Sequence, residues 1–316
     1  MRRFILTRKH LAAALLITLL SASRVHAILA GDENALPADS PANRLDTLGA
    51  ASPFNAIGSL SISADGFSYI GSATAISPDW VLTAGHNLDV NDAGSPTPGL
   101  NVSFNLPGFG SYSGSTFYTC PGFTGFGNPS IQRDLGLIHL ANPLPNNLLF
   151  PTLSGHLQTG TEITLAGFGR SGYGSYGYTT FATLTDRRSG QNTVDTLISD
   201  DQGGGFAALF QYTFNAPNTG DSLGNNIETI IGPGDSGGPA LVADGSGYAI
   251  VGVNTYVDGY GGRFGDIGGG IVLAPYVDWI NNTMAVPEPS ATALMVLGLV
   301  ILLFRPTHRA RIIAER

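Results

Sequence analysis

Short hydrophobic segments that alternate with polar residues recur along the chain, and they limit the possible fold more than any other feature. The segments are bounded by Gly, Ser, Asp and Pro and occupy residues 56–62, 68–76, 79–85, 134–140, 162–169 and 248–257. A period of two is typical of half-buried β-strands. The 43 glycines suit tight turns between short strands. The sequence therefore predicts an antiparallel all-β protein, and for roughly 255 residues spacing alone leaves one large barrel or two smaller ones open.

The charge of the central part excludes one class of partner. Nine of the 15 Lys+Arg residues lie in 1–27 and 305–316, whereas only two of the 23 acidic residues lie beyond residue 286. Residues 28–286 therefore hold six basic and 21 acidic residues, a net charge of −15, and no lysine. Because binding to phosphates depends on Lys and Arg, no nucleic-acid partner is expected.

The first 27 residues have the layout of a signal peptide. A basic start is followed by an apolar run over residues 11–20 and by Val25-His26-Ala27, which is close to the small-x-small pattern that signal peptidase accepts. A permanent anchor is the alternative, but spanning a bilayer takes about 20 apolar residues. We therefore expect signal peptidase as a partner and export of residues 28–286, which we call the body.

Residues 286–316 form a second targeting segment. Pro287-Glu288-Pro289 precedes the apolar residues 291–304 and a basic tail. A helix of this length measures about 21 Å, which is short for a hydrocarbon core of about 30 Å. The layout resembles the PEP-CTERM sorting signals of Gram-negative bacteria, which an exosortase-type sorting enzyme reads.

The PEP-CTERM resemblance implies a short transmembrane helix over residues 291–304 that holds the protein in the membrane before processing. The final location would be outside the cell or at the cell surface. An ordinary single-pass anchor is the alternative. Both interpretations place the body outside, because basic flanks remain in the cytoplasm.

Three motifs resemble those of the trypsin-like (chymotrypsin-fold) serine endopeptidases. They are VLTAGH ending at His86, DLGLI beginning at Asp134, and GDSGGP containing Ser236. Their order is that of the chymotrypsin group and differs from the order in subtilisins and α/β-hydrolases. The resemblance implies two antiparallel six-stranded β-barrels, approximately residues 28–150 and 151–285, with a short C-terminal helix.

The resemblance also assigns roles to the motif residues. Ser236 is a poor nucleophile alone, and His86 would act as its general base, since an unperturbed imidazole titrates at about 6.5. A buried Asp134 would orient the imidazole, and the N–H groups of Gly234 and Ser236 would form the oxyanion hole. The implied reaction is hydrolysis of a protein or peptide substrate through an acyl-enzyme intermediate, without a cofactor or metal.

The resemblance further places Thr255 and Tyr256 on a strand edge that pairs with an extended substrate. Ile230 lies six residues before Ser236, where trypsins proper carry the acid of the specificity pocket. We therefore expect a pocket that does not attract Arg or Lys, with Asp266 as the second candidate for the missing charge. The cysteines that usually clamp this pocket are absent, since Cys120 is the single cysteine.

Activation is the second departure from the family pattern. In the family a new N-terminus pairs with the aspartate before the serine, which is Asp235 here. Cleavage after Ala27 would create such an N-terminus at Ile28. About 20 residues more than the family needs separate Ile28 from Pro53, so a disordered leader is the alternative.

Two other functions remain open from the sequence. A catalytically silent surface protein with the trypsin fold would be expected to lack a triad residue, and none is lost. A structural protein of an extracellular matrix is suggested only by the glycine content and the C-terminal segment. Reaction with an active-site serine probe separates both from an enzyme.

Overall fold

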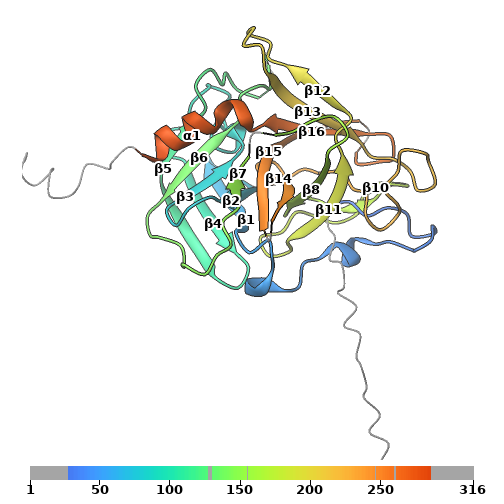
Figure 1. Ribbon diagram of the computed structural model, residues 1–316. Helices are drawn as coiled ribbons and strands as arrows, with labels where there is room; N and C mark the ends of the chain where they lie inside the picture. Colours follow the sequence, from blue (N-terminus) through green and yellow to red (C-terminus); the bar gives the residue numbers. More distant parts are fainter. Residues whose placement is uncertain (1–27, 127–129, 155, 246, 260, 286–316) are drawn as a thin grey trace, which may run out of the picture.

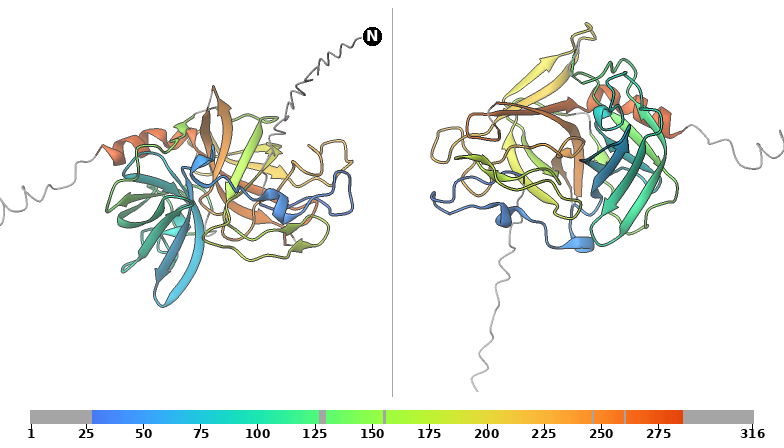
Figure 2. Two further views of the ribbon diagram at one scale, coloured as in Figure 1. Left: turned by 90° about the horizontal axis from the view of Figure 1, so that it is seen from below. Right: turned by 180° about the vertical axis from the view of Figure 1, so that it is seen from behind.

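The computed structural model describes residues 28–126, 130–154, 156–245, 247–259 and 261–285. Two β units lie side by side within these residues, as Figures 1 and 2 show. The predicted signal peptide and sorting signal, residues 1–27 and 286–316, lie outside the described part. Within the described part, no helix combines the length and apolar character needed to cross a membrane.

The first unit is a closed six-stranded barrel with the strand order β1-β2-β3-β6-β5-β4. Its strands are β1 (Ile57–Ala64), β2 (Phe67–Ala75), β3 (Trp80–Thr83), β4 (Asn101–Leu106), β5 (Gly110–Thr119) and β6 (Gly136–Leu140). All neighbours run antiparallel. Alternate side chains such as Leu60, Ile62, Val102 and Phe104 are buried together, as the period of a strand requires.

The second unit is an eight-stranded sheet with the order β11-β8-β14-β15-β16-β13-β12, and β7 pairs with β15. Its strands are β7 (Thr152–Leu153), β8 (Glu162–Gly167), β11 (Arg188–Thr193), β12 (Thr196–Ser199), β13 (Ala207–Thr213), β14 (Pro239–Asp244), β15 (Gly247–Asp258) and β16 (Ile267–Val272). A separate pair consists of β9 (Gly172–Tyr173) and β10 (Gly177–Tyr178). The predicted second six-stranded barrel is thus an eight-stranded sheet in this structure.

The predicted fold class is confirmed, because a closed barrel and a further antiparallel sheet are followed by one short C-terminal helix, α1 (Val277–Met284). Its Ile280 belongs to a hydrophobic cluster that also contains Trp80 and Cys120 of the first unit. In Figure 1 α1 lies beside β5 and β6. The C-terminal end of the second unit is therefore fixed against the first.

The N-terminal segment lies against the second unit, so the predicted assignment of residues 28–150 to the first barrel needs correction at its start. Leu45 forms a β-bridge with Arg188 of β11, and the fully buried Arg44 donates to the carbonyl of Glu228 at 2.8 Å. Arg44 also pairs with Asp39 at 2.6 Å. The alternative of a disordered leader is thereby ruled out for the described residues.

A second buried arginine continues this attachment towards the first barrel. Arg187 pairs with Asp46 at 2.8 Å and donates to the carbonyl oxygens of Gly49 and Ile57. Removing one partner of such a pair leaves a buried charge, which costs about 3–5 kcal/mol. The extra N-terminal residues, 32–51, thus form a fixed strap that contacts both units.

Candidate active site

His86 and Asp134 come together because the strands that carry them are neighbours. His86 lies in the short 3-10 helix Gly85–Asn87, soon after β3, and Asp134 lies just before β6. Since Thr83 pairs with Gly136 in the β3–β6 ladder, both side chains leave the barrel at the same end. His86 Nδ1 lies 2.7 Å from Asp134 Oδ2, and the His86 N–H donates to Asp134 Oδ1 at 2.7 Å.

The loop around Ser236 fits against the first barrel only because it contains glycine. Gly237 has a positive φ of 86°, and a Cβ atom there would lie 2.1 Å from Thr83 Oγ1 and 2.3 Å from the Ser72 carbonyl oxygen. Gly237 also donates its N–H to Asn254 of β15 at 2.8 Å. The motif around Ser236 therefore lies between the two units and contacts both.

The backbone of Ser236 is hydrogen-bonded directly to the first barrel. Its carbonyl oxygen accepts the N–H of Ser72 and the side-chain amide of Asn87, both at 2.9 Å. Asn87 directly follows His86, so this contact couples the serine and histidine segments. Among the described contacts no hydrogen bond joins His86 to the Ser236 hydroxyl, and such bonds commonly tighten only when substrate is bound.

The N–H groups assigned to the oxyanion hole are free to donate. Within the described residues, neither Gly234 nor Ser236 gives its N–H to a protein acceptor. Gly234 has a φ of 99°, and its carbonyl oxygen accepts the hydroxyl of Ser72 at 2.8 Å. This places the carbonyl of Gly234 towards the barrel and leaves the two N–H groups for another acceptor.

Asp235 is buried beneath the serine loop. Its carboxylate accepts the N–H groups of Gly169 at 2.7 Å and Gly232 at 2.8 Å. Burial raises its pKa to about 6, although these two hydrogen bonds and the charge of Arg188 act in the opposite direction. A Cβ atom at Gly169 would lie 2.6 Å from the carboxyl carbon, so the segment Gly167-Phe168-Gly169 leaves the space that Asp235 occupies.

Ile28 is buried close to this region, but within the described residues no hydrogen bond joins it to Asp235. Its side chain is 1% exposed and shares a hydrophobic cluster with Ile230 and Ile231. Its carbonyl oxygen accepts the hydroxyl of Ser171. Ile28 has a φ of 79°, which is rare for a β-branched residue and indicates strain.

A cavity of about 270 Å³ opens beside Ser236. The residues that line it are Phe126, Tyr178, Ile231, Gly232, Pro233, Ser236, Thr255, Tyr256, Val257, Gly259 and Gly261. The predicted substrate-binding residues Thr255 and Tyr256 thus share one cavity with the serine. None of the lining residues carries a formal charge.

Ile230 needs correction as a pocket residue. It is fully buried in the core and does not line the cavity, whereas Ile231 does. The Ile230 carbonyl oxygen accepts the N–H of Leu29 at 3.2 Å. Asp266 does not line the cavity either, although its carboxylate lies behind the lining residue Gly259, where a Cβ atom would be 2.1 Å from Asp266 Oδ1. This carboxylate accepts the N–H groups of Gly262 and Arg263. The carboxylate of Asp266, the second candidate for a pocket charge, is therefore hydrogen-bonded within its own loop.

Phe126 and Asp92 were not found by sequence reasoning. The Phe126 ring lies 4.7 Å from the His86 ring, measured between centroids, and its N–H donates to Asp92 Oδ1 at 3.0 Å. No motif or period distinguishes either residue. Burial lowers the pKa of His86, but the charge and hydrogen bond of Asp134 and the charge of Asp92 outweigh burial, so the pKa is raised.

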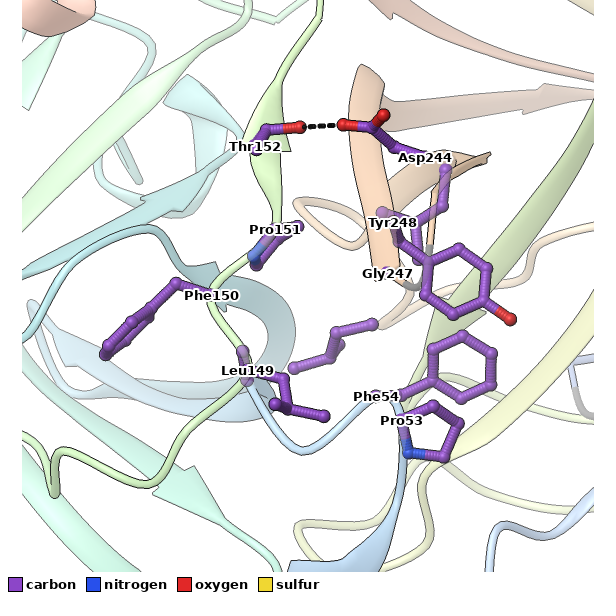
Figure 3. A pocket seen from close by; sticks show the side chains of 12 residues that line it. Pro53, Phe54, Leu149, Phe150, Pro151, Thr152, Asp244, Gly247 and Tyr248 are labelled. Carbon is purple, nitrogen blue, oxygen red and sulfur yellow. Dashed lines mark hydrogen bonds between the residues drawn. The ribbon is translucent and has the colours of Figure 1, made fainter.

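A second cavity of about 300 Å³ is unrelated to the motif residues (Figure 3). Phe54 and Tyr248 form much of its wall, with ring centroids 5.1 Å apart. Its polar edge is a hydrogen bond of 2.9 Å from Thr152 to Asp244. None of the predicted site residues lines it.

No cluster of His, Cys, Asp or Glu suited to a metal ion occurs in the described part of the chain.

A closed barrel beside a second antiparallel sheet, with a histidine–aspartate pair and a glycine-bounded serine where they meet, is the arrangement of a serine-type peptidase. The trypsin family profile matches residues 49–280. The chain therefore belongs to the trypsin family and is a serine-type peptidase.

One solved structure illustrates the fold. Mouse neuropsin, described as a serine protease expressed in the limbic system of the brain, superposes with a TM-score of 0.53 at 15% identity, over 76% of this chain and 98% of the neuropsin chain. At this identity the likeness concerns the fold alone. A search of curated protein sequences found no match.

The raised pKa of His86 predicts a pH profile. kcat/KM should increase with pH as His86 loses its proton, with a midpoint above about 6.5, because only neutral imidazole accepts a proton. Asp92→Asn should lower the midpoint, since it removes a charge that favours the protonated ring. Asp65→Asn, an exposed change in the β1–β2 turn, is the control. A flat profile between about pH 5 and 8 would contradict the role of His86.

Proposed function

We propose that this chain is an exported serine endopeptidase that cleaves peptide bonds with the triad Ser236, His86 and Asp134. The main support is the pair of 2.7 Å hydrogen bonds between His86 and the buried Asp134. They hold the ring with Nδ1 towards the carboxylate, which leaves Nε2 for the serine. The hydrogen bond from Asn87 to the Ser236 carbonyl keeps both segments together.

The reaction follows from these positions. Ser236 Oγ attacks the carbonyl carbon of the substrate while its proton moves to His86 Nε2, and Asp134 stabilises the resulting imidazolium. The oxyanion accepts the N–H groups of Gly234 and Ser236. His86 then protonates the leaving amine, and the acyl-enzyme is hydrolysed when His86 removes a proton from water.

The substrate would bind as an added strand beside Thr255 and Tyr256. The β14–β15 ladder ends at the pair Pro239 and Val253, while β15 continues to Asp258. The edge beyond Asn254 therefore borders the cavity beside Ser236, and an extended peptide can pair with it. An uncharged cavity lining favours an apolar or small side chain before the cleaved bond, because an unpaired buried cation costs several kcal/mol.

Removal of residues 1–27 would also activate the enzyme through an ion pair between Ile28 and Asp235. Ile28 is buried in the hydrophobic cluster that contains Ile231, and the adjacent Leu29 donates its N–H to the Ile230 carbonyl oxygen, two residues before the Gly232 whose N–H binds Asp235. The strained φ of Ile28 would be released by cleavage before it. The new ammonium would then offer the buried carboxylate a cation.

Export and sorting complete the proposal. Signal peptidase would remove residues 1–27, and an exosortase-type enzyme would process the segment 286–316 after a transient stay of helix 291–304 in the membrane. The body would act outside a Gram-negative cell or at its surface.

The triad is tested by Ser236→Ala and His86→Ala. Each should reduce kcat by about 10⁴ to 10⁶, since triad members act as one unit. A fluorophosphonate should label the wild type and not Ser236→Ala, while the exposed Ser111→Ala serves as the matched control. More than about a tenth of the activity in either triad variant would exclude the assignment, and an unlabelled wild type would favour a catalytically silent binding protein.

Activation is tested by comparing protein that begins at Ile28 with protein that retains Ala27. The first should have a kcat/KM higher by roughly tenfold or more, because only it can pair an ammonium with Asp235. Asp235→Asn should remove the difference. N-terminal sequencing and mass measurement of the exported protein report the cleavage sites. Equal activity of the two forms would overturn the ion pair.

Cleavage preference is tested by digesting an unbiased peptide library and sequencing the new termini. Apolar and small residues should dominate before the cleaved bond, because the cavity presents no carboxylate to a cation. Cleavage concentrated after Arg and Lys would show that an acid such as Asp266 reaches the cavity.

A further inference from the structure

Tyr178 contacts two segments that both contribute walls to the cavity beside Ser236, Gly232–Pro233 and Gly261–Gly262. One wall contains Gly232, where a Cβ atom would lie 2.7 Å from Tyr178 Cε1. The other wall contains Gly261 and leads to Gly262, where a Cβ atom would lie 2.7 Å from the same ring carbon. The ring therefore fills space that exists only because both walls carry glycine.

The ring is fixed from several sides. The Tyr178 N–H donates to the Gly261 carbonyl oxygen at 3.3 Å. The guanidinium carbon of Arg170 lies 5.1 Å from the ring centroid, within the range of a cation–π contact. The backbone N–H of Arg170 in turn donates to the carbonyl oxygen of Pro233 in the first wall at 2.9 Å. Burial first, and then the charges of Asp235 and Asp266, raise the pKa of Tyr178, so the ring stays neutral.

No covalent link can join the two walls within this chain. The single cysteine, Cys120, is buried in the hydrophobic cluster with Trp80 and Ile280, and neither wall contains a cysteine. The two walls are therefore held in place by packing and hydrogen bonds alone. Tyr178 is in contact with both of them and also lines the cavity.

We propose that Tyr178 is a specificity-determining residue: its ring fills space between the lining segments Gly232–Pro233 and Gly261–Gly262 and so limits the cavity to small and medium apolar side chains. This proposal rests on the proposed peptidase function, because the cavity is taken to receive the substrate residue before the cleaved bond. Tyr178 acts through shape and makes no proton transfer.

The test compares peptides that differ only in that residue, carrying Ala, Val, Leu or Phe. The variants are Tyr178→Ala and Tyr178→Phe, with Tyr176→Ala as the matched control, because Tyr176 is an exposed tyrosine of the same loop that does not line the cavity. The measured quantity is the ratio of kcat/KM for the Phe peptide to that for the Ala peptide.

Tyr178→Ala should raise this ratio by about tenfold or more, because the enlarged cavity accepts a ring. It should also reduce kcat/KM for the Ala peptide by up to about 100-fold, since loosened walls misplace the substrate. Tyr178→Phe and Tyr176→Ala should leave the ratio within about threefold of the wild type. An unchanged ratio in Tyr178→Ala would overturn the proposal.

Two readouts separate the possible failures. Fluorophosphonate labelling of the wild type reports whether Ser236 is a working nucleophile, so an unlabelled, inactive wild type would refute the proposed function itself. Thermal unfolding by circular dichroism reports whether Tyr178→Ala folds. If it does not fold, two milder variants replace it. Tyr178→Leu keeps part of the side-chain volume and should still raise the ratio, whereas the larger Tyr178→Trp should lower it. An unchanged ratio in both variants would refute the role of Tyr178.

Discussion

The serine loop touches the neighbouring barrel with its backbone, and the rest of the site depends on this contact. A Cβ atom at Gly237 would overlap Thr83 and Ser72, and the carbonyl of Ser236 accepts two hydrogen bonds from the barrel. A side chain at this point would separate the units and carry Ser236 away from His86. Docking of the two units and formation of the site are therefore one structural event.

The antiparallel all-β class could be predicted because it depends on local pattern, whereas the division into two units followed only from the family resemblance. The six alternating segments all correspond to strands, including β1, β3 and β15. The strands β4, β5, β7, β11–β14 and β16 of the two units were not predicted, and β16 was missed because its central residues are the glycines 268–270. The rings of Tyr212 and Tyr256 fill the space where side chains at Gly268 and Gly269 would be, and the Val253 backbone fills it at Gly270. This burial comes from distant strands and leaves no hydrophobic period in β16 itself.

The site was predictable only where motif residues follow or precede strands. His86 and Asp134 flank strands that pair, so their meeting follows once β3 and β6 are neighbours. Ile230 and Ile231 show the limit, because they are adjacent residues of the same type and a single sequence does not reveal which one lines the cavity. Phe126, Asp92 and Tyr178 enter through long-range contacts that no local pattern encodes.

The buried arginines have a consequence for how the molecule meets others in solution. Of the six arginines of the body, only Arg263 lies on the open surface, while Arg44 and Arg187 are enclosed with their acids. The exterior therefore presents carboxylates with almost no cations among them. Like-charged copies repel one another, and basic polypeptides are drawn in over a range of about 8 Å at physiological salt. Salt would thus change how often a basic polypeptide arrives, while the proposed choice of cleaved bond by the uncharged cavity would depend much less on salt.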